Sequence, residues 1–288
     1  MSLFSNKSGK LIVSGDSYAD ATRRENFGFQ DVWGNNIANF LESDEIFHPS
    51  NLINTANSGA GNTEIFNKTL DELIFNKNIK LVIVMWSEFQ RMDFEAFHKR
   101  PGAKYPDIGW RHLHPHRITR YEAVTLNPEA KNKLLKYNSI IASTLAVLRL
   151  FWITQNILKD IPHLMIQGCT PICTPHLGPL SVFGQPDDYY NIIVKECIRF
   201  MLKSSYVDLI EGKKFIGWPL WQQLGGFSID DHLDKLDPEQ EKYRVSEEDT
   251  HPNYAGHKII SELISIITVK LSNLLCLAKS KASQVEPS

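Results

Sequence analysis

The 288-residue sequence predicts an α/β protein in three layers (α/β/α), with helices on both faces of a mainly parallel central sheet. Short apolar segments alternate along the chain with longer segments of helical periodicity, which is the order of strands and helices in such a fold. The apolar segments are nearly continuous, as in strands that are buried on both faces. Because 42% of the residues are hydrophobic and no internal repeat is visible, we expect one domain over residues 1–278.

The first half of the chain contains three of the expected strands. They are "KLIV" at residues 10–13, "NLINTAN" at 51–57 and "IKLVIVMW" at 79–86. Residues 28–41 and 62–75 space their apolar residues along one helical face. Asn62 is a candidate cap for the second of these helices.

The second half continues the alternation. We expect helices at residues 129–160, as one helix or two, at 188–203 and at 253–275, and strands in "HLMIQGC" at 163–169 and "YVDLI" at 206–210. Residues from about 92 to 128 interrupt the pattern, so we expect an insertion at the carboxyl end of the third strand. The polar tail at 279–288 is expected to be disordered.

Charge and cysteine content exclude several classes of protein. The formal net charge of -2 gives no electrostatic footprint for nucleic acid or an anionic membrane, and four scattered cysteines do not make a disulfide framework. The N-terminus lacks the apolar core of a signal peptide, and no segment approaches the ~18 apolar residues of a membrane span. We therefore expect a cytoplasmic protein as synthesised, without a nucleic-acid or membrane partner; a homo-oligomer stays open.

Polar residues follow the first expected strand directly, in "SGDS" at residues 14–17. Ligands of parallel α/β sheets bind beyond the carboxyl ends of the strands, so Ser17 is a candidate nucleophile. A serine nucleophile needs a histidine base, and the histidine needs an acid that orients it. The segment "EEDTHPNYAGH" supplies both, since it places Glu248, Asp249 and His251 in a polar loop before the last helix.

Three segments, "SGDS", "NSGAGN" at residues 57–62 and "DTHPNYAGH" at 249–257, resemble three sequence blocks of the SGNH hydrolases, also called the GDSL esterase/lipase family. Their order and spacing agree with the family over nearly the whole chain. The resemblance implies a flavodoxin-like three-layer fold and a serine esterase that needs no metal or organic cofactor. It also implies that Ser17 is the nucleophile and His251 the general base.

The resemblance further implies an oxyanion hole. The backbone N–H groups of Ser17 and Gly59 would donate to the oxyanion, with Gly61 as the alternative to Gly59. The family usually carries its acid three positions before the histidine, which is Glu248 here. Relatives with Asp-x-His-Pro resemble this chain better, so Asp249 is preferred and Glu248 is kept as the alternative.

The sequence departs from the family after the third expected strand. Relatives carry Gly-x-Asn-Asp there, whose asparagine amide donates to the oxyanion, but "VMWSEFQRMDF" at residues 84–94 has neither that glycine nor that asparagine. Ser87 is a candidate replacement donor, and Arg91 could reach into the site. The Trp-Ser-x-x-x-Arg pattern is similar to one in phage and marine-microbe members of the family, and a virion association would follow for a chain of phage origin.

The expected insertion lies beside the expected cleft and is rich in His, Arg, Trp and Tyr. Trp110 and Tyr121 suit stacking on a sugar, and Asn62 and Arg91 are further candidate substrate contacts. His112 alternates with two more histidines, but without a nearby carboxylate or cysteine we expect no metal site.

Together these residues predict a serine esterase that removes an O-acetyl or other short acyl group from a carbohydrate. Two alternatives stay open: a catalytically silent glycan-binding or structural protein of a virion or surface assembly, and an O-acyltransferase with the same triad. The missing Gly-x-Asn-Asp block favours the silent protein. The distance between Ser17 and His251 in the folded chain distinguishes the two hypotheses, because an enzyme needs these side chains within hydrogen-bond reach.

Overall fold

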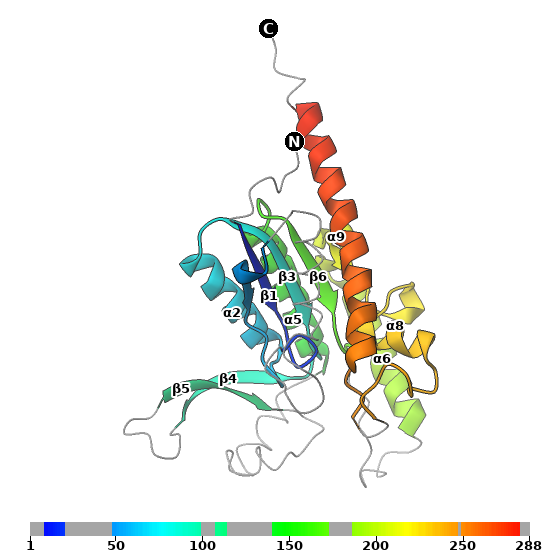
Figure 1. Cartoon of the computed structure of the whole chain (residues 1–288). Helices are drawn as coiled ribbons and strands as arrows, with labels where there is room; N and C mark the ends of the chain where they lie inside the picture. Colours follow the sequence, from blue (N-terminus) through cyan, green and yellow to red (C-terminus); the bar gives the residue numbers. More distant parts are fainter. Residues whose placement is uncertain are drawn as a thin grey trace.

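The computed structural model describes residues 9–20, 48–98, 107–113, 140–172, 186–246 and 249–282. The strands of its central sheet are β1 (Lys10–Ser14), β2 (Leu52–Asn54), β3 (Ile79–Trp86), β6 (His163–Gln167) and β7 (Phe215–Ile216). They lie in the order β2-β1-β3-β6-β7, and every neighbouring pair is parallel (Figure 1). The carboxyl ends of the strands therefore meet at one edge of the sheet.

The described helices are α2 (Asn62–Phe75), α5 (Ile140–Ile157), α6 (Pro186–Lys203), α7 (Tyr206–Leu209), α8 (Ile229–Leu236) and α9 (Tyr254–Ala282), with short 3-10 turns η1 (Pro49–Asn51), η3 (Gly212–Lys214) and η4 (Gln222–Leu224). They cover both faces of the sheet. Ile12 and Val82 belong to a core with residues of α2, α5 and α6, whereas Val13 and Ile83 belong to a core with residues of α8 and α9. Successive strand residues point to opposite faces, so each continuous apolar strand fills two cores. The predicted three-layer α/β class is confirmed.

Four of the five predicted strands are present as β1, β2, β3 and β6, but the prediction of a strand at "YVDLI" is wrong. Residues Tyr206–Leu209 form α7 instead, where helical spacing lets Val207 and Ile210 pack against the core under α5 and α6. The fifth strand is β7, which is 2 residues long and pairs with β6. A strand this short has no period that a sequence pattern can show.

Part of the expected insertion is regular. Strands β4 (Met92–His98) and β5 (Asp107–Leu113) form an antiparallel pair that projects beyond the carboxyl edge of the central sheet (Figure 1). Helix α9 continues to Ala282, so residues 279–282 of the expected tail extend the helix. The expected helices at residues 28–41 and 129–139 lie outside the described residues.

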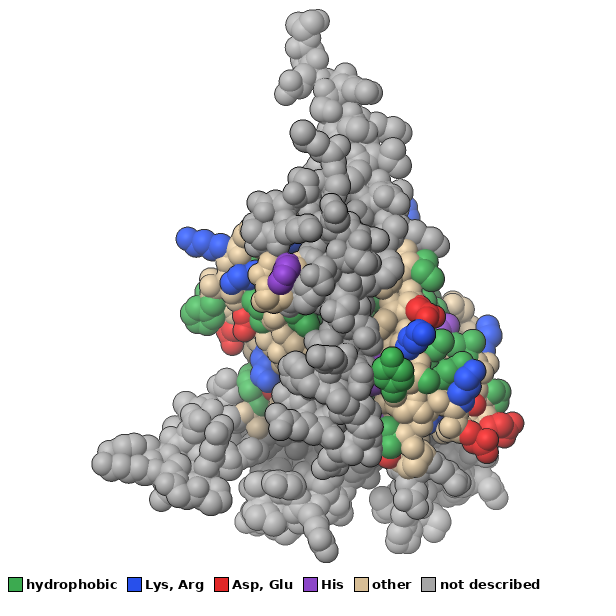
Figure 2. All heavy atoms as spheres, viewed as in Figure 1, with side chains coloured by type: hydrophobic (Ala, Val, Ile, Leu, Met, Phe, Trp, Pro, Cys, Tyr) green, Lys and Arg blue, Asp and Glu red, His purple; other side chains and the backbone are tan. Residues whose placement is uncertain are grey.

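The distribution of charged side chains on the drawn face agrees with the small net charge of the sequence. Acidic and basic side chains both occur on the left and on the right of the face drawn in Figure 2. None of the helices that the structure describes combines the length and the apolar character needed to cross a bilayer.

Candidate active site

The turn after β1 carries Ser17. Asp16 shapes this turn, because its carboxylate accepts the backbone N–H of Tyr18 at 3.0 Å. Gly15 fits at the start of the turn, since a Cβ there would lie only 3.1 Å from Met85 Cβ and 3.2 Å from Met85 O. The turn therefore holds Ser17 at the carboxyl edge of the sheet, where ligands of such sheets bind.

The loop that carries His251 lies just before α9 and folds back on the segment before it. The N–H of Val245 donates to the carbonyl of His251 at 2.9 Å, and Arg244 pairs with Pro252 as an antiparallel bridge. The Asn253 side chain donates to the carbonyl of Arg244 at 2.7 Å. Proline and asparagine are typical turn residues, and these contacts give the loop a defined shape.

Ser17, His251 and Asp249 lie in one chain of contacts, although Ser17 and His251 are 234 residues apart in the sequence. Ser17 Oγ is 2.8 Å from His251 Nε2. His251 Nδ1 contacts Asp249 Oδ1, and the backbone N–H of His251 donates to the same oxygen at 3.2 Å. A carboxylate at Nδ1 favours the tautomer whose Nε2 can accept the proton of the serine. Glu248, the alternative acid, lies outside the described residues.

The three side chains lie at the border between interior and solvent. Ser17 is 7% exposed, whereas the side chains of His251 and Asp249 are 22% and 31% exposed. The ring of Tyr18 lies against the imidazole, with 5.4 Å between the ring centroids and a tilt of 46°. This contact restricts the rotation of the imidazole, while His251 and Asp249 remain partly exposed to solvent.

One of the two candidate oxyanion glycines is engaged elsewhere. The N–H of Gly61 donates to Asp93 Oδ1 at 2.8 Å, and a Cβ on Gly61 would lie 2.6 Å from both carboxylate oxygens of Asp93. Gly59 has a φ of 88°, in the left-handed region that favours glycine. Within the described ranges, neither the N–H of Gly59 nor that of Ser17 donates to another residue.

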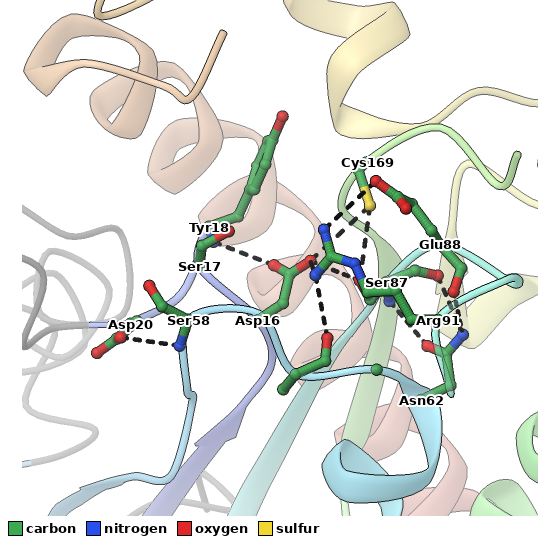
Figure 3. A network of polar contacts seen from close by, with 12 residues as sticks. Asp16, Ser17, Tyr18, Asp20, Ser58, Asn62, Ser87, Glu88, Arg91 and Cys169 are labelled. Atoms are coloured by element: carbon green, nitrogen blue, oxygen red, sulfur yellow. Dashed lines mark hydrogen bonds and ion pairs between the residues drawn. The ribbon is translucent and has the colours of Figure 1, made fainter. Parts of the chain in front are cut away.

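Ser87 and Arg91 are buried side chains that contact the carboxylate of Asp16 (Figure 3). The fully buried Ser87 hydroxyl donates to Asp16 Oδ2 at 2.8 Å. Arg91 Nη1 lies 3.3 Å from the same oxygen and 3.1 Å from the carbonyl oxygen of Ala60, and Nη2 lies 3.3 Å from Glu88 Oε1. These internal contacts disfavour Ser87 as an oxyanion donor and Arg91 as a substrate contact, because both groups are bound within the protein.

Asn62 is also internal. Its carboxamide donates to the carbonyls of Ser87 and Glu88, each at 3.1 Å, and accepts the N–H of Ser87 at 2.8 Å. It is the first residue of α2, whose N-cap is Gly61, so the predicted cap is wrong. The internal hydrogen bonds disfavour Asn62 as a substrate contact. The side chain instead ties the loop after β3 to the start of α2.

The buried groups around Asp16 shift the pKa values of Arg91 and Cys169. Burial opposes the charge on Arg91, but Glu88 and Asp16 outweigh it and raise the pKa of the guanidinium further. Burial, followed by the carboxylates of Asp16 and Glu88, raises the pKa of Cys169, so this thiol stays protonated and unreactive. The sequence reasoning missed Asp16 as the centre of this network, although its place inside "SGDS" was an available signal.

Some predicted site residues are only partly described. Trp110 lies on β5 and is partly buried, and Tyr121 lies outside the described residues. His112 also lies on β5, but the two histidines that alternate with it are outside the described ranges. Among the residues that the structure describes, no group of three or more His, Cys, Asp or Glu side chains could hold a metal ion.

No protein-family model and no curated protein matches this sequence. Distant likenesses to solved structures exist. LAE5, an alpha/beta hydrolase enzyme from the metagenome of Lake Arreo, is 13% identical with a TM-score of 0.46, over 93% of this chain and 99% of that one. Psychrotrophic esterase EstA from Pseudoalteromonas sp. is 10% identical with a TM-score of 0.45, over 92% and 100%. A lipolytic G-D-S-L family protein from Veillonella parvula is 11% identical with a TM-score of 0.41, over 88% and 95%. Values this low identify no reaction, so a functional assignment depends on the arrangement of Ser17, His251 and Asp249.

Proposed function

We propose that the chain is a serine hydrolase of the SGNH type that cleaves a carboxylic ester with Ser17, His251 and Asp249. The observation that carries the proposal is the chain of contacts from Asp249 through the imidazole to Ser17 Oγ, which lies 2.8 Å from His251 Nε2. This order of acid, base and nucleophile is what a serine needs to become reactive. Its place at the carboxyl edge of a parallel sheet supports the same function.

In the proposed reaction, His251 takes the proton from Ser17 as Oγ attacks the acyl carbon, and Asp249 stabilises the imidazolium. The imidazolium then gives its proton to the leaving alkoxide, which departs as the alcohol. A water molecule, deprotonated by His251, attacks the acyl-enzyme and releases the carboxylic acid. Ser17 recovers its proton from His251 in the same step.

We assign the oxyanion to the backbone N–H groups of Ser17 and Gly59. The bond from Gly61 to Asp93 favours Gly59 over Gly61, because it engages the only donor that the Gly61 backbone has. The Ser87 hydroxyl is held by Asp16 and does not replace the asparagine of the family. Since one oxyanion donor is worth about 10²- to 10³-fold in rate, we expect slower turnover than in relatives that retain the asparagine.

For the substrate, we propose a short acyl ester on a carbohydrate, with an O-acetyl group as the first choice. The partly buried Trp110 on β5 supports this choice, because indole faces pack well against sugar rings. The aromatic and cationic residues between β3 and α5 in the sequence also favour a polar substrate over a lipid, which calls for a large apolar surface.

Hydrolysis of a short-chain aryl acetate tests the reaction. Wild type, Ser17→Ala and His251→Ala are compared, with circular dichroism to establish that all three are folded. We expect both variants to lose at least ~10³-fold in kcat. A folded wild type that is no faster than the variants contradicts the esterase proposal and favours the silent glycan-binding alternative. Release of acetate from O-acetylated oligosaccharides, with and without an acceptor sugar, then tests the substrate and separates hydrolysis from acyl transfer.

A further inference from the structure

A second polar cluster lies beside the candidate triad and has no role in the reaction described above. We call it the Arg244 cluster; it consists of Tyr18, Asp230, Asp234, Arg244 and the carbonyl of Thr250. The Tyr18 hydroxyl donates to Asp230 Oδ1 at 2.5 Å, and Arg244 Nη1 donates to the same oxygen at 2.7 Å. The same Nη1 donates to the carbonyl of Thr250 at 2.7 Å, and Nη2 donates to Asp234 Oδ1 at 2.5 Å.

The Arg244 cluster connects the two loops that hold the triad. Tyr18 is the residue after Ser17, and Thr250 lies between Asp249 and His251. The path from the Tyr18 hydroxyl through Asp230 and the guanidinium reaches the main chain of the histidine loop. Nucleophile and base come from opposite ends of the chain, so their separation depends on contacts of this kind.

The cluster is anchored firmly to the rest of the fold. The second oxygen of the Asp230 carboxylate accepts the N–H of Thr170, and the N–H of Asp230 donates to the carbonyl of Gly168, at 3.1 and 3.2 Å. Asp230 lies in the first turn of α8, which begins with a capping box between Ser228 and Asp231. The anchor therefore joins α8 to the carboxyl end of β6.

Charge and burial suit a permanent structural contact. The Arg244 side chain is 2% exposed and faces two carboxylates, Asp230 and Asp234. Burial opposes the charge on Arg244, but Asp230 leads the groups that outweigh it and raise the pKa of the guanidinium. Burial and the Asp230 charge likewise raise the pKa of Tyr18, so its hydroxyl keeps the proton that it donates.

We propose that Tyr18 and Arg244 are positioning residues that set the distance between Ser17 and His251. The inference rests on the proposed function, because it concerns the geometry of that reaction. A displacement of about 1 Å between reacting groups can lower a rate by about 10²-fold. Loss of either link should therefore reduce kcat more than it reduces substrate binding.

Three variants test the proposal by their kinetics on the aryl acetate. Tyr18→Phe removes the hydroxyl but keeps the ring that lies against His251, and Arg244→Lys keeps the charge but loses the fork that reaches Asp230 and Thr250. Thr268→Val is the matched control: it removes a buried hydroxyl that donates to Ile264 O at 2.8 Å within α9.

We expect kcat to fall about 10-fold in Tyr18→Phe and about 100-fold in Arg244→Lys, with KM changed less than about 2-fold. Thr268→Val should keep kcat within about 2-fold, even where its melting temperature falls as far as that of Tyr18→Phe. If kcat of both cluster variants matches the control, the cluster is not a positioning device and the inference is overturned.

A second readout separates this inference from the proposed function. Hydrogen exchange of the backbone amides at Val245 and Asn253 reports on the histidine loop whether or not the protein hydrolyses an ester. If the wild type hydrolyses no ester, the proposed function is wrong. The hydrogen-exchange rates then decide whether the Arg244 cluster anchors the histidine loop. Exchange at least about 10-fold faster in Arg244→Lys than in Thr268→Val supports that role, and equal exchange overturns it.

Discussion

Arg91→Met tests the buried charge network beneath the nucleophile turn, because it removes the cation and keeps an unbranched apolar stem. The Arg91 side chain is 7% exposed, and its nitrogens lie 3.3 Å from oxygens of Asp16 and Glu88. At an effective dielectric constant of about 20, each pair has a gross attraction of about 5 kcal/mol. Desolvation in the native protein and water entry in the variant offset much of this sum. We therefore expect the free energy of unfolding to fall by about 3 to 5 kcal/mol.

Urea unfolding followed by tryptophan fluorescence measures this loss. Arg199→Met is the matched control, since it removes a guanidinium that is 52% exposed and pairs with Glu196 at 2.6 Å. A surface pair of this kind contributes about 1 kcal/mol or less. Adding Asp16→Asn to Arg91→Met removes a charge left without its cation, so the double variant should recover about 1 kcal/mol. A loss in Arg91→Met no larger than in the control would refute the reasoning from burial.

Three further predictions concern single groups. Asp249→Asn should lower kcat of ester hydrolysis about 10⁴-fold, and Glu248→Gln less than about 3-fold; the opposite ranking in steady-state kinetics would make Glu248 the acid. Burial lowers the pKa of His163 in the folded protein, so the unfolded chain takes up the proton first and stability should be lost as the pH falls below about 6.5. His163→Asn should flatten this loss in urea unfolding at pH 7 and pH 5, and an unchanged slope would contradict the assignment. Burial raises the pKa of Cys169, so iodoacetamide at pH 8 should modify it at least about 10²-fold more slowly in the folded than in the urea-unfolded protein, as peptide mass mapping can measure. Equal rates would mean that the thiol is accessible and ionised.

The sequence predicted the sheet well because the information for a buried strand is local. The continuous apolar run of β3 and the glycine after β1 each indicate a strand and its end without reference to other parts of the chain. The same reasoning failed at α7 and β7, where elements of 4 and 2 residues are too short for a period. For these short segments the packing of the surrounding core decided the conformation.

At the site, the sequence by itself placed Ser17 and His251 in the two loops that the fold brings together, since each loop follows or precedes an element with a clear pattern. Only the tertiary structure decided which nearby polar residues face the interior. Asn62 finds its partners 25 and 26 residues away, and Arg91 finds Asp16 at a distance of 75 residues, so no local pattern distinguishes them from substrate contacts. A buried polar group must be paired within the protein, and that pairing depends on which segments the complete fold brings into contact.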